Sequence, residues 1–192
     1  SAAAELLCGV GSPSGKLSDT FAKKLEDYPS SETFHESVKY VDYKEDIYVG
    51  YRYFETIPGA DKAVNYPFGY GLSYTTFERA LVSAEEKQGV IRVRVNVTNT
   101  GKYPGKEVMQ LYAQAPQGVL GKAKRVLAAF EKTRLLAQGE TQLLTLEAPV
   151  AQLASYDDLG KIQKSAYVLE KGKYQFYLGT SVRETEQVFC FT

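Results

Sequence analysis

The clearest pattern in the chain is a strict alternation of apolar and polar residues over residues 90–98, VIRVRVNVT. Its apolar members fall on one side of an extended chain: Ile91, Val93, Val95 and Val97. Side chains along a strand point alternately to the two faces of a sheet, so this segment buries one face and exposes the other. The alternation predicts an antiparallel strand that covers a packed core.

Short apolar segments follow at intervals to the end of the chain. They are EVMQLYAQA, RVLAAFEKTRLL, TQLLTLEA, SAYVL, KYQFYLG and EQVFCFT. Residues that favour turns separate them, and Glu170-Lys171-Gly172 predicts a hairpin between SAYVL and KYQFYLG. About seven short strands with turns between them are typical of a β-sandwich.

Residues 12–60 show no long period and contain several proline and glycine turns. One apolar run, DIYVGYRYF at residues 46–54, alternates and predicts a short strand, with Gly50 at a bulge or a close backbone approach. For Arg52 we expect a salt bridge within the domain, the alternative being the rim of an active site. The polar stretch at residues 24–45 predicts a surface excursion.

Aromatic residues are dense in VNYPFGYGLSYTTF, residues 64–77. This segment has two interpretations: a stacking platform for a flat ligand such as a sugar ring, or a packed strap that joins two bodies of structure. Sugar-stacking surfaces often use Trp, and the chain has none, which counts against the platform. In a strap, we expect Phe68, Tyr74 and Phe77 to bury apolar area at the joint.

The first residues, SAAAELLCGVG, consist of good helix formers followed by glycine. They resemble the last turns of a helix, so we expect the chain to be a fragment of a longer protein.

Composition narrows the choice of partners. Lys plus Arg and Asp plus Glu both number 23, so no basic excess is present to neutralise nucleic acid or an anionic membrane. No apolar run is long enough to span a bilayer. Cys8 and Cys190 predict free, mostly buried thiols, which weakly favours a reducing, cytoplasmic compartment. The single His35 excludes a multi-histidine metal site and is expected at the surface.

The sequence contains incomplete matches to three motifs, two that bind nucleotides and one that holds a catalytic nucleophile, and each lacks a required residue. GVGSPSGKL has Val10 and Leu17 where a phosphate loop needs Gly and Ser or Thr. GYGLSY has Tyr74 in place of the third glycine of a dinucleotide-binding motif, and Ser73 lacks the closing glycine of a nucleophile elbow.

Paired carboxylates are the remaining route to hydrolysis. Glu45-Asp46 and Asp157-Asp158 are candidates, but neighbours on a strand point to opposite faces, and we expect solvated surface charge at both pairs. Asn96 fits a glycosylation triplet on the outer face of its strand, a match that carries little weight by itself.

Several longer motifs resemble one family in sequence order. GSPSGKLSDTF, YKEDIYVGYRYF and YPFGYGLSYTTF resemble the end of the α/β-sandwich domain of glycoside hydrolase family 3 β-glucosidases. The family's fibronectin type III-like domain is similar to VNVTNTGKYPGKEVMQLYAQAP, KRVLAAFEKTRLLAQGETQLLTL, LASYDD and YVLEKGKYQFYLGTS. Ser18 departs from the family, which usually has Pro after GKL.

The resemblance implies a mainly β fold. Residues 78–192 would form a fibronectin type III or immunoglobulin-like β-sandwich. It would be preceded, at residues 1–77, by a truncated piece of an α/β-sandwich domain. In this family the nucleophile is an Asp on a (β/α)8 barrel, and the acid/base is a Glu before the PSGKL motif. We therefore assign no catalytic, substrate-binding, cofactor-binding or metal-binding residue here and expect no cofactor.

Two functions follow from this reading. The first is a non-catalytic portion of a retaining β-glycosidase that acts on β-linked glucosides or oligosaccharides. Its partners would be the barrel and the rest of the α/β domain, with no nucleic acid and no membrane. The alternative is a stand-alone β-sandwich module that binds carbohydrate or protein.

Overall fold

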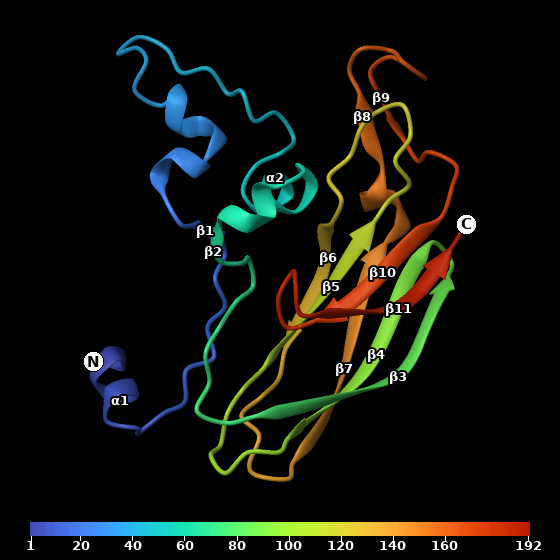
Figure 1. Ribbon diagram of the computed structural model, residues 1–192. Helices are drawn as coiled ribbons and strands as arrows, with labels where there is room; N and C mark the ends of the chain where they lie inside the picture. The colour runs from blue at the N-terminus through green and yellow to red at the C-terminus, as the bar shows by residue number, and fades with distance from the viewer.

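The computed structural model describes residues 1–192 as two parts that lie side by side (Figure 1). The N-terminal part contains short elements only. They are α1 (Ala2–Leu7), β1 (Phe21–Ala22), η1 (Leu25–Asp27), η2 (Pro29–Glu32), α2 (Tyr51–Thr56), η3 (Ala60–Ala63) and β2 (Val64–Tyr66). β1 and β2 pair antiparallel, which closes the segment between them, residues 23–63, into a loop. The predicted helix at the N-terminus is confirmed as α1.

The second part is a sandwich of two antiparallel sheets. One has the strand order β3 (Phe77–Lys87), β4 (Val90–Asn99) and β7 (Thr141–Pro149). The other has the order β11 (Thr185–Phe191), β10 (Tyr174–Gly179), β5 (Val108–Gln114) and β6 (Val126–Lys132). The chain crosses between the sheets after β4, β6 and β7. The last crossing contains η4 (Val150–Leu153) and a small hairpin of β8 (Ser155–Asp157) and β9 (Ala166–Val168).

The predicted alternation fills the space between the sheets. Every second residue of β4 from Ile91 to Val97 is fully buried, as are Leu111 and Phe176 on the facing sheet. Burying a side chain of this size stabilises the fold by about 1.5–3 kcal/mol. The expected β-sandwich is therefore confirmed.

A tyrosine at the start of β10 adds a local signature. The Tyr174 hydroxyl donates a hydrogen bond of 2.9 Å to the carbonyl of Glu170, four residues upstream. This arrangement matches the tyrosine corner that marks immunoglobulin-like sandwiches. Burial raises the pKa of Tyr174, which keeps the hydroxyl protonated as the donor.

The strand predicted at DIYVGYRYF is wrong, because the segment ends in the helix α2. Gly50 has φ +57° at the residue before the helix, a conformation that glycine adopts without steric cost. Tyr51 and Phe54 then lie three residues apart on one face of the helix, and Phe54 is 1% exposed. Ile47 and Val49, the other apolar residues of the run, are exposed.

Three further expectations need correction. SAYVL forms β9, which pairs with β8, so no hairpin joins it to β10. β3, the longest strand, was not predicted, because its charged and apolar residues do not alternate strictly around a bulge at Leu81/Ser83. Cys8 and Cys190 are free as expected, but both are exposed rather than buried.

Neither α-helix, at six residues each, could cross a membrane.

Candidate functional site

The aromatic segment at residues 64–77 leads from the N-terminal part into the sandwich and packs against it. The ring of Phe68 lies 4.4 Å from the ring of Tyr51, and both meet the fully buried Tyr112 edge-on. Tyr112 belongs to β5, so these three rings join α2, the aromatic segment and the four-stranded sheet. Because the rings are used against one another, this geometry favours the strap over the ligand platform.

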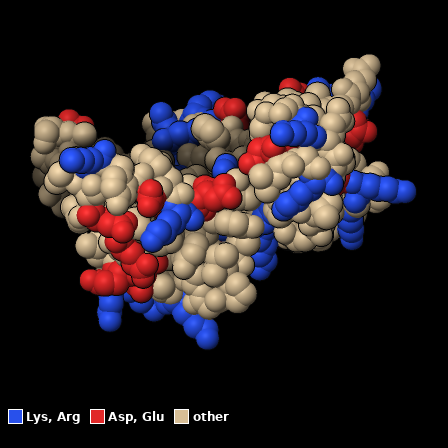
Figure 2. Space-filling view, turned by 90° about the horizontal axis from the view of Figure 1, so that it is seen from above, with Lys and Arg blue, Asp and Glu red and all other residues tan.

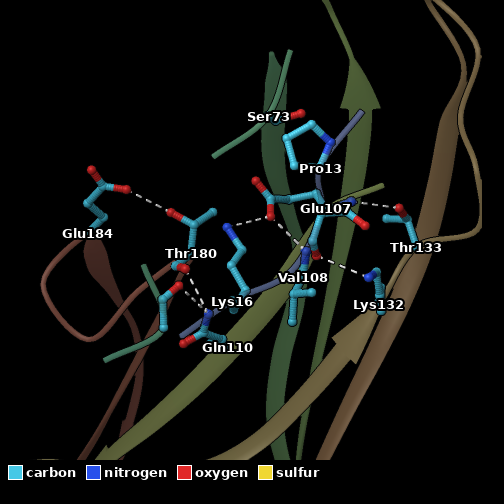
Figure 3. A network of polar contacts seen from close by, with 12 residues as sticks. Pro13, Lys16, Ser73, Glu107, Val108, Gln110, Lys132, Thr133, Thr180 and Glu184 are labelled. Atoms are coloured by element: carbon cyan, nitrogen blue, oxygen red, sulfur yellow. Dashed lines mark hydrogen bonds and ion pairs between the residues drawn. The ribbon is translucent and has the colours of Figure 1, made fainter. Parts of the chain in front are cut away.

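Gln110 forms the polar centre of the joint (Figure 3). Its side chain is buried on β5, and Nε2 donates to the carbonyls of Gly69, at 3.2 Å, and Thr180, at 2.7 Å. The Tyr112 hydroxyl donates to Gln110 Oε1. Burial raises the pKa of Tyr112, so the phenol remains a donor. A Cβ at Gly69 would lie 2.1 Å from Gln110 Oε1, so only glycine allows this approach.

Backbone hydrogen bonds hold the strap on both sides. The N–H of Val182 donates to the carbonyl of Phe68 at 3.0 Å, which attaches the strap to the sandwich. The N–H of Leu17 donates to the carbonyl of Tyr70, and the N–H of Gly69 donates to the carbonyl of Leu17. The strap therefore lies between the GKL segment and the loop after β10 and is hydrogen-bonded to both.

Asn99 secures the lower end of the strap. It is fully buried, and its Oδ1 accepts hydrogen bonds from Thr75 Oγ1, at 2.7 Å, and the N–H of Gly101. Its Nδ2 donates to the carbonyls of Tyr103 and Leu136, both at 2.8 Å. One side chain therefore ties the last residues of the strap to two loops of the sandwich.

Charged side chains reinforce the same boundary. Lys16 Nζ lies 2.8 Å from Glu107 Oε1, with both side chains largely shielded from solvent (Figure 3). Lys132 Nζ donates to the carbonyl of Ser14 at 3.0 Å. Farther up, Arg183 Nε pairs with Glu55 Oε1 at 2.8 Å. These contacts hold the N-terminal part at Ser14, Lys16 and Glu55.

The aromatic residues of the strap differ in how far their side chains are buried. Phe68 and Phe77 are half-buried, and Phe77 packs against the sandwich core, as predicted. Tyr74 is 49% exposed, contrary to the prediction, and its hydroxyl donates to the carbonyl of Leu6. The rings of Tyr66 and Tyr70 pack against each other, 5.2 Å apart.

Asp157 was expected to be a solvated surface charge, and this prediction is wrong. Its side chain is 1% exposed, and its two carboxylate oxygens accept four backbone hydrogen bonds, from residues 160–163. Burial alone raises the pKa of Asp157, but these four hydrogen bonds outweigh it and the pKa lies below its ordinary value. The neighbouring Asp158 is exposed, so the two acids do not face each other.

The remaining candidate residues lie apart from the joint. Arg52 forms no ion pair, contrary to the prediction, and lines a cleft together with Asp46 and Asp158. His35 is exposed, and Asn96 lies on the outer side of β4, both as expected. No three side chains among His, Cys, Asp and Glu come close enough together to hold a metal ion.

A sandwich of three and four strands, a tyrosine corner and a packed N-terminal strap define the class: a fibronectin type III-like domain joined to a second, smaller unit. The family model for the fibronectin type III-like domain matches residues 107–182. The resemblance seen in the sequence is confirmed: the chain matches the C-terminal part of the glycoside hydrolase family 3 β-glucosidases.

The relatives match nearly the whole chain. It is 60% identical to β-glucosidase A of Butyrivibrio fibrisolvens over 199 residues, covering 96% of this chain and 24% of that protein. It is 49% identical to a β-glucosidase of Ruminococcus albus, covering 98% and 20%. The solved β-glucosidase of Paenibacillus barengoltzii superimposes with a TM-score of 0.94 at 54% identity, covering 98% of this chain and 20% of that one. The chain thus spans about a quarter or less of the length of these relatives.

Proposed function

We propose that this chain is a non-catalytic, scaffolding portion of a retaining β-glycosidase that acts on β-linked glucosides or oligosaccharides. Residues 1–77 belong to its α/β-sandwich domain and residues 78–192 to its fibronectin type III-like domain. The observation that carries the proposal is the joint at Gln110, whose buried amide bonds the strap and the sandwich at once. A joint of this kind holds two domains at a fixed angle.

The partner of this scaffold is the remainder of the parent enzyme. The N-terminal part exposes many large apolar side chains and buries only two, Phe54 and Val64. The exposed side chains include Leu7, Val10, Leu25, Phe34, Val38, Tyr43 and Val49. A surface this apolar is typical of a protein contact. In the view from above, acidic side chains gather on this side of the molecule (Figure 2).

The hydrogen bonds of Asp157 support a role outside catalysis for the pair Asp157-Asp158. Retaining glycosidases use two carboxyl groups about 5–5.5 Å apart, one of which must be free to attack the sugar. All of the hydrogen-bonding capacity used by Asp157 is directed to the backbone of its own loop. The family resemblance assigns the nucleophile and the acid/base to other segments.

Hydrolysis of 4-nitrophenyl β-D-glucoside tests the absence of catalysis. The purified 192-residue chain should release no nitrophenol above the rate in buffer, while full-length β-glucosidase A of Butyrivibrio fibrisolvens serves as the positive control. Turnover that copurifies with the chain and is lost on its removal with an affinity resin would refute the proposal.

A chimera tests the scaffolding role. In it, this chain replaces the matching 24% of the Butyrivibrio enzyme. We expect the chimera to fold and to hydrolyse the glucoside, whereas the enzyme without this portion should be inactive or insoluble. Full activity and unchanged thermal stability after deletion would show that the portion is no scaffold.

A further inference from the structure

A cleft of about 470 Å³ opens at the upper end of the molecule, between the N-terminal part and the sandwich. Its walls come from residues 46–52, from the loop between β5 and β6, and from residues 152–158. The space-filling view from this end shows the molecule hollowed between its two parts (Figure 2). The volume lies within the range of about 300–1,000 Å³ that is usual for small-molecule sites.

The walls of the cleft are held in place by contacts outside its lining. The N–H of Leu127 donates to the Tyr51 hydroxyl at 2.9 Å, and the N–H of Lys124 donates to Thr56 Oγ1 at 2.8 Å. Within the β5–β6 loop, Lys122 forms a buried ion pair with Glu170. The cleft is therefore preformed, and Lys122 presents no uncompensated charge to it.

Three charged side chains of the cleft, unlike Lys122, have no partner within the chain. Asp46 and Arg52 line it from the first of these walls and Asp158 from residues 152–158, and none of the three takes part in an ion pair. A guanidinium offers a fork of donors, and a carboxylate offers acceptors only. Together they provide the complementary set that a ligand bearing several hydroxyl groups requires, since each hydroxyl both donates and accepts.

An aromatic pair stands at the edge of the same cleft. Tyr156 lines it and faces Tyr167 across the β8–β9 hairpin, with ring centroids 5.2 Å apart. Both side chains are exposed, at 52% and 77%. The backbone bonds to Asp157 fix the hairpin loop that follows Tyr156. A rigid ring beside hydrogen-bonding groups can pack against the apolar face of a sugar ring.

We propose that this cleft binds a neutral saccharide, with Tyr156 as the packing surface and Arg52, Asp46 and Asp158 as hydrogen-bonding groups. Two carboxylates beside one guanidinium disfavour anionic ligands such as phosphorylated sugars or acidic peptides. The mixed lining, polar at the acids and apolar at Leu120, Ala123 and Val126, suits a ring with one polar edge and one apolar face.

Isothermal titration calorimetry of the 192-residue chain with cellobiose tests this site. We expect saturable binding that weakens by about tenfold or more in Tyr156→Ala and in Arg52→Ala, because each removes a separate contact. The matched controls are Tyr103→Ala and Arg94→Ala, which alter an exposed tyrosine and an exposed arginine that do not line the cleft. Circular dichroism spectra establish that all four variants are folded.

The titrations have outcomes that support the saccharide site and outcomes that overturn it. Binding that is lost in the two cleft variants and retained in the two controls supports the site. Absence of saturable heat with the folded wild-type chain overturns it, and so does binding that survives both cleft substitutions. Either negative result leaves the hydrolysis and chimera experiments unaffected, so failure of the cleft and failure of the scaffold are distinguishable.

Discussion

Gln110 is a polar residue in the interior of a strand, and three groups depend on its side chain. Replacing Gln110 with Leu would leave the carbonyls of Gly69 and Thr180 and the Tyr112 hydroxyl without their partner. Buried polar groups left unpaired are costly, so we expect the free energy of unfolding to fall by about 2–3 kcal/mol. Urea denaturation measures the change. Gln187→Leu, on the exposed side of β11, is the control and should change stability by less than about 0.5 kcal/mol.

Gln88 adopts φ +55° in the turn between β3 and β4, followed by Gly89 with φ +76°. A two-residue turn with both φ values positive prefers Asn-Gly, because asparagine tolerates the left-handed region better than glutamine. We expect Gln88→Asn to raise the free energy of unfolding by about 0.5–1 kcal/mol. The same substitution at Gln142, within β7, would not stabilise the protein, and a loss of stability in Gln88→Asn would contradict the turn geometry.

The residues of the joint show where sequence reasoning stops. The aromatic strap was predictable because its density of rings around Pro67 is unusual. Asn99 and Gln110 were not, since Asn99 reads as a loop residue and Gln110 as the polar half of an alternating strand. Their roles depend on carbonyl groups from segments far away in the sequence, at Leu136 and Thr180, which no local pattern reveals.

At the scale of elements, the β8–β9 hairpin depends on a charge. The folded state holds the pKa of Asp157 below its ordinary value of 3.8. Ionised Asp157 therefore stabilises the fold above about pH 4, and this contribution is lost as the pH falls through the lowered pKa. We expect the difference in unfolding free energy between the wild type and Asp157→Asn to shrink as the pH falls from about 4 through the lowered pKa of Asp157.

Urea denaturation between pH 6 and about pH 2 measures this difference. Asp158→Asn, which leaves the four backbone hydrogen bonds intact, is the matched control. A difference between the wild type and Asp157→Asn that stays constant over the whole interval would show that the charge of Asp157 contributes nothing to the hairpin.

The strand with the strictest alternation, β4, was predicted correctly, whereas α2 and β3 were not. The alternation of β4 follows from its burial on one side only, so the pattern is visible in the sequence. The segment at residues 46–54 alternates by coincidence, and the positive φ of Gly50 turns its second half into α2. β3 has a bulge and faces solvent along much of its length, which removes the period that would reveal it.

At the scale of the whole molecule, the strap couples the two parts. Phe68→Ala would remove the ring that Tyr51 and Tyr112 pack against. We expect backbone amides of residues 51–66 to exchange with solvent at least about tenfold faster, while β4, β5 and β10 keep their protection. Hydrogen exchange with mass spectrometry measures both regions at once. Equal acceleration in both would show that the two parts unfold as one unit.

The sandwich itself was predictable from the sequence, but its relation to the N-terminal part was not. Seven strands with turns between them limit the second part to a few topologies. The contacts that fix the first part on it join Lys16 to Glu107 and Glu55 to Arg183, pairs that are 91 and 128 residues apart. Pairs of residues this far apart in the sequence become neighbours only in the folded protein, so no local sequence pattern predicts them.

The two exposed cysteines allow this relation to be measured directly. Cys8 follows α1 in the N-terminal part, and Cys190 lies near the end of β11 in the sandwich. Each part thus carries one reactive thiol, and no other thiol competes for a maleimide. A donor and an acceptor dye attached to this natural pair would report, molecule by molecule, whether the angle between the parts stays constant or fluctuates.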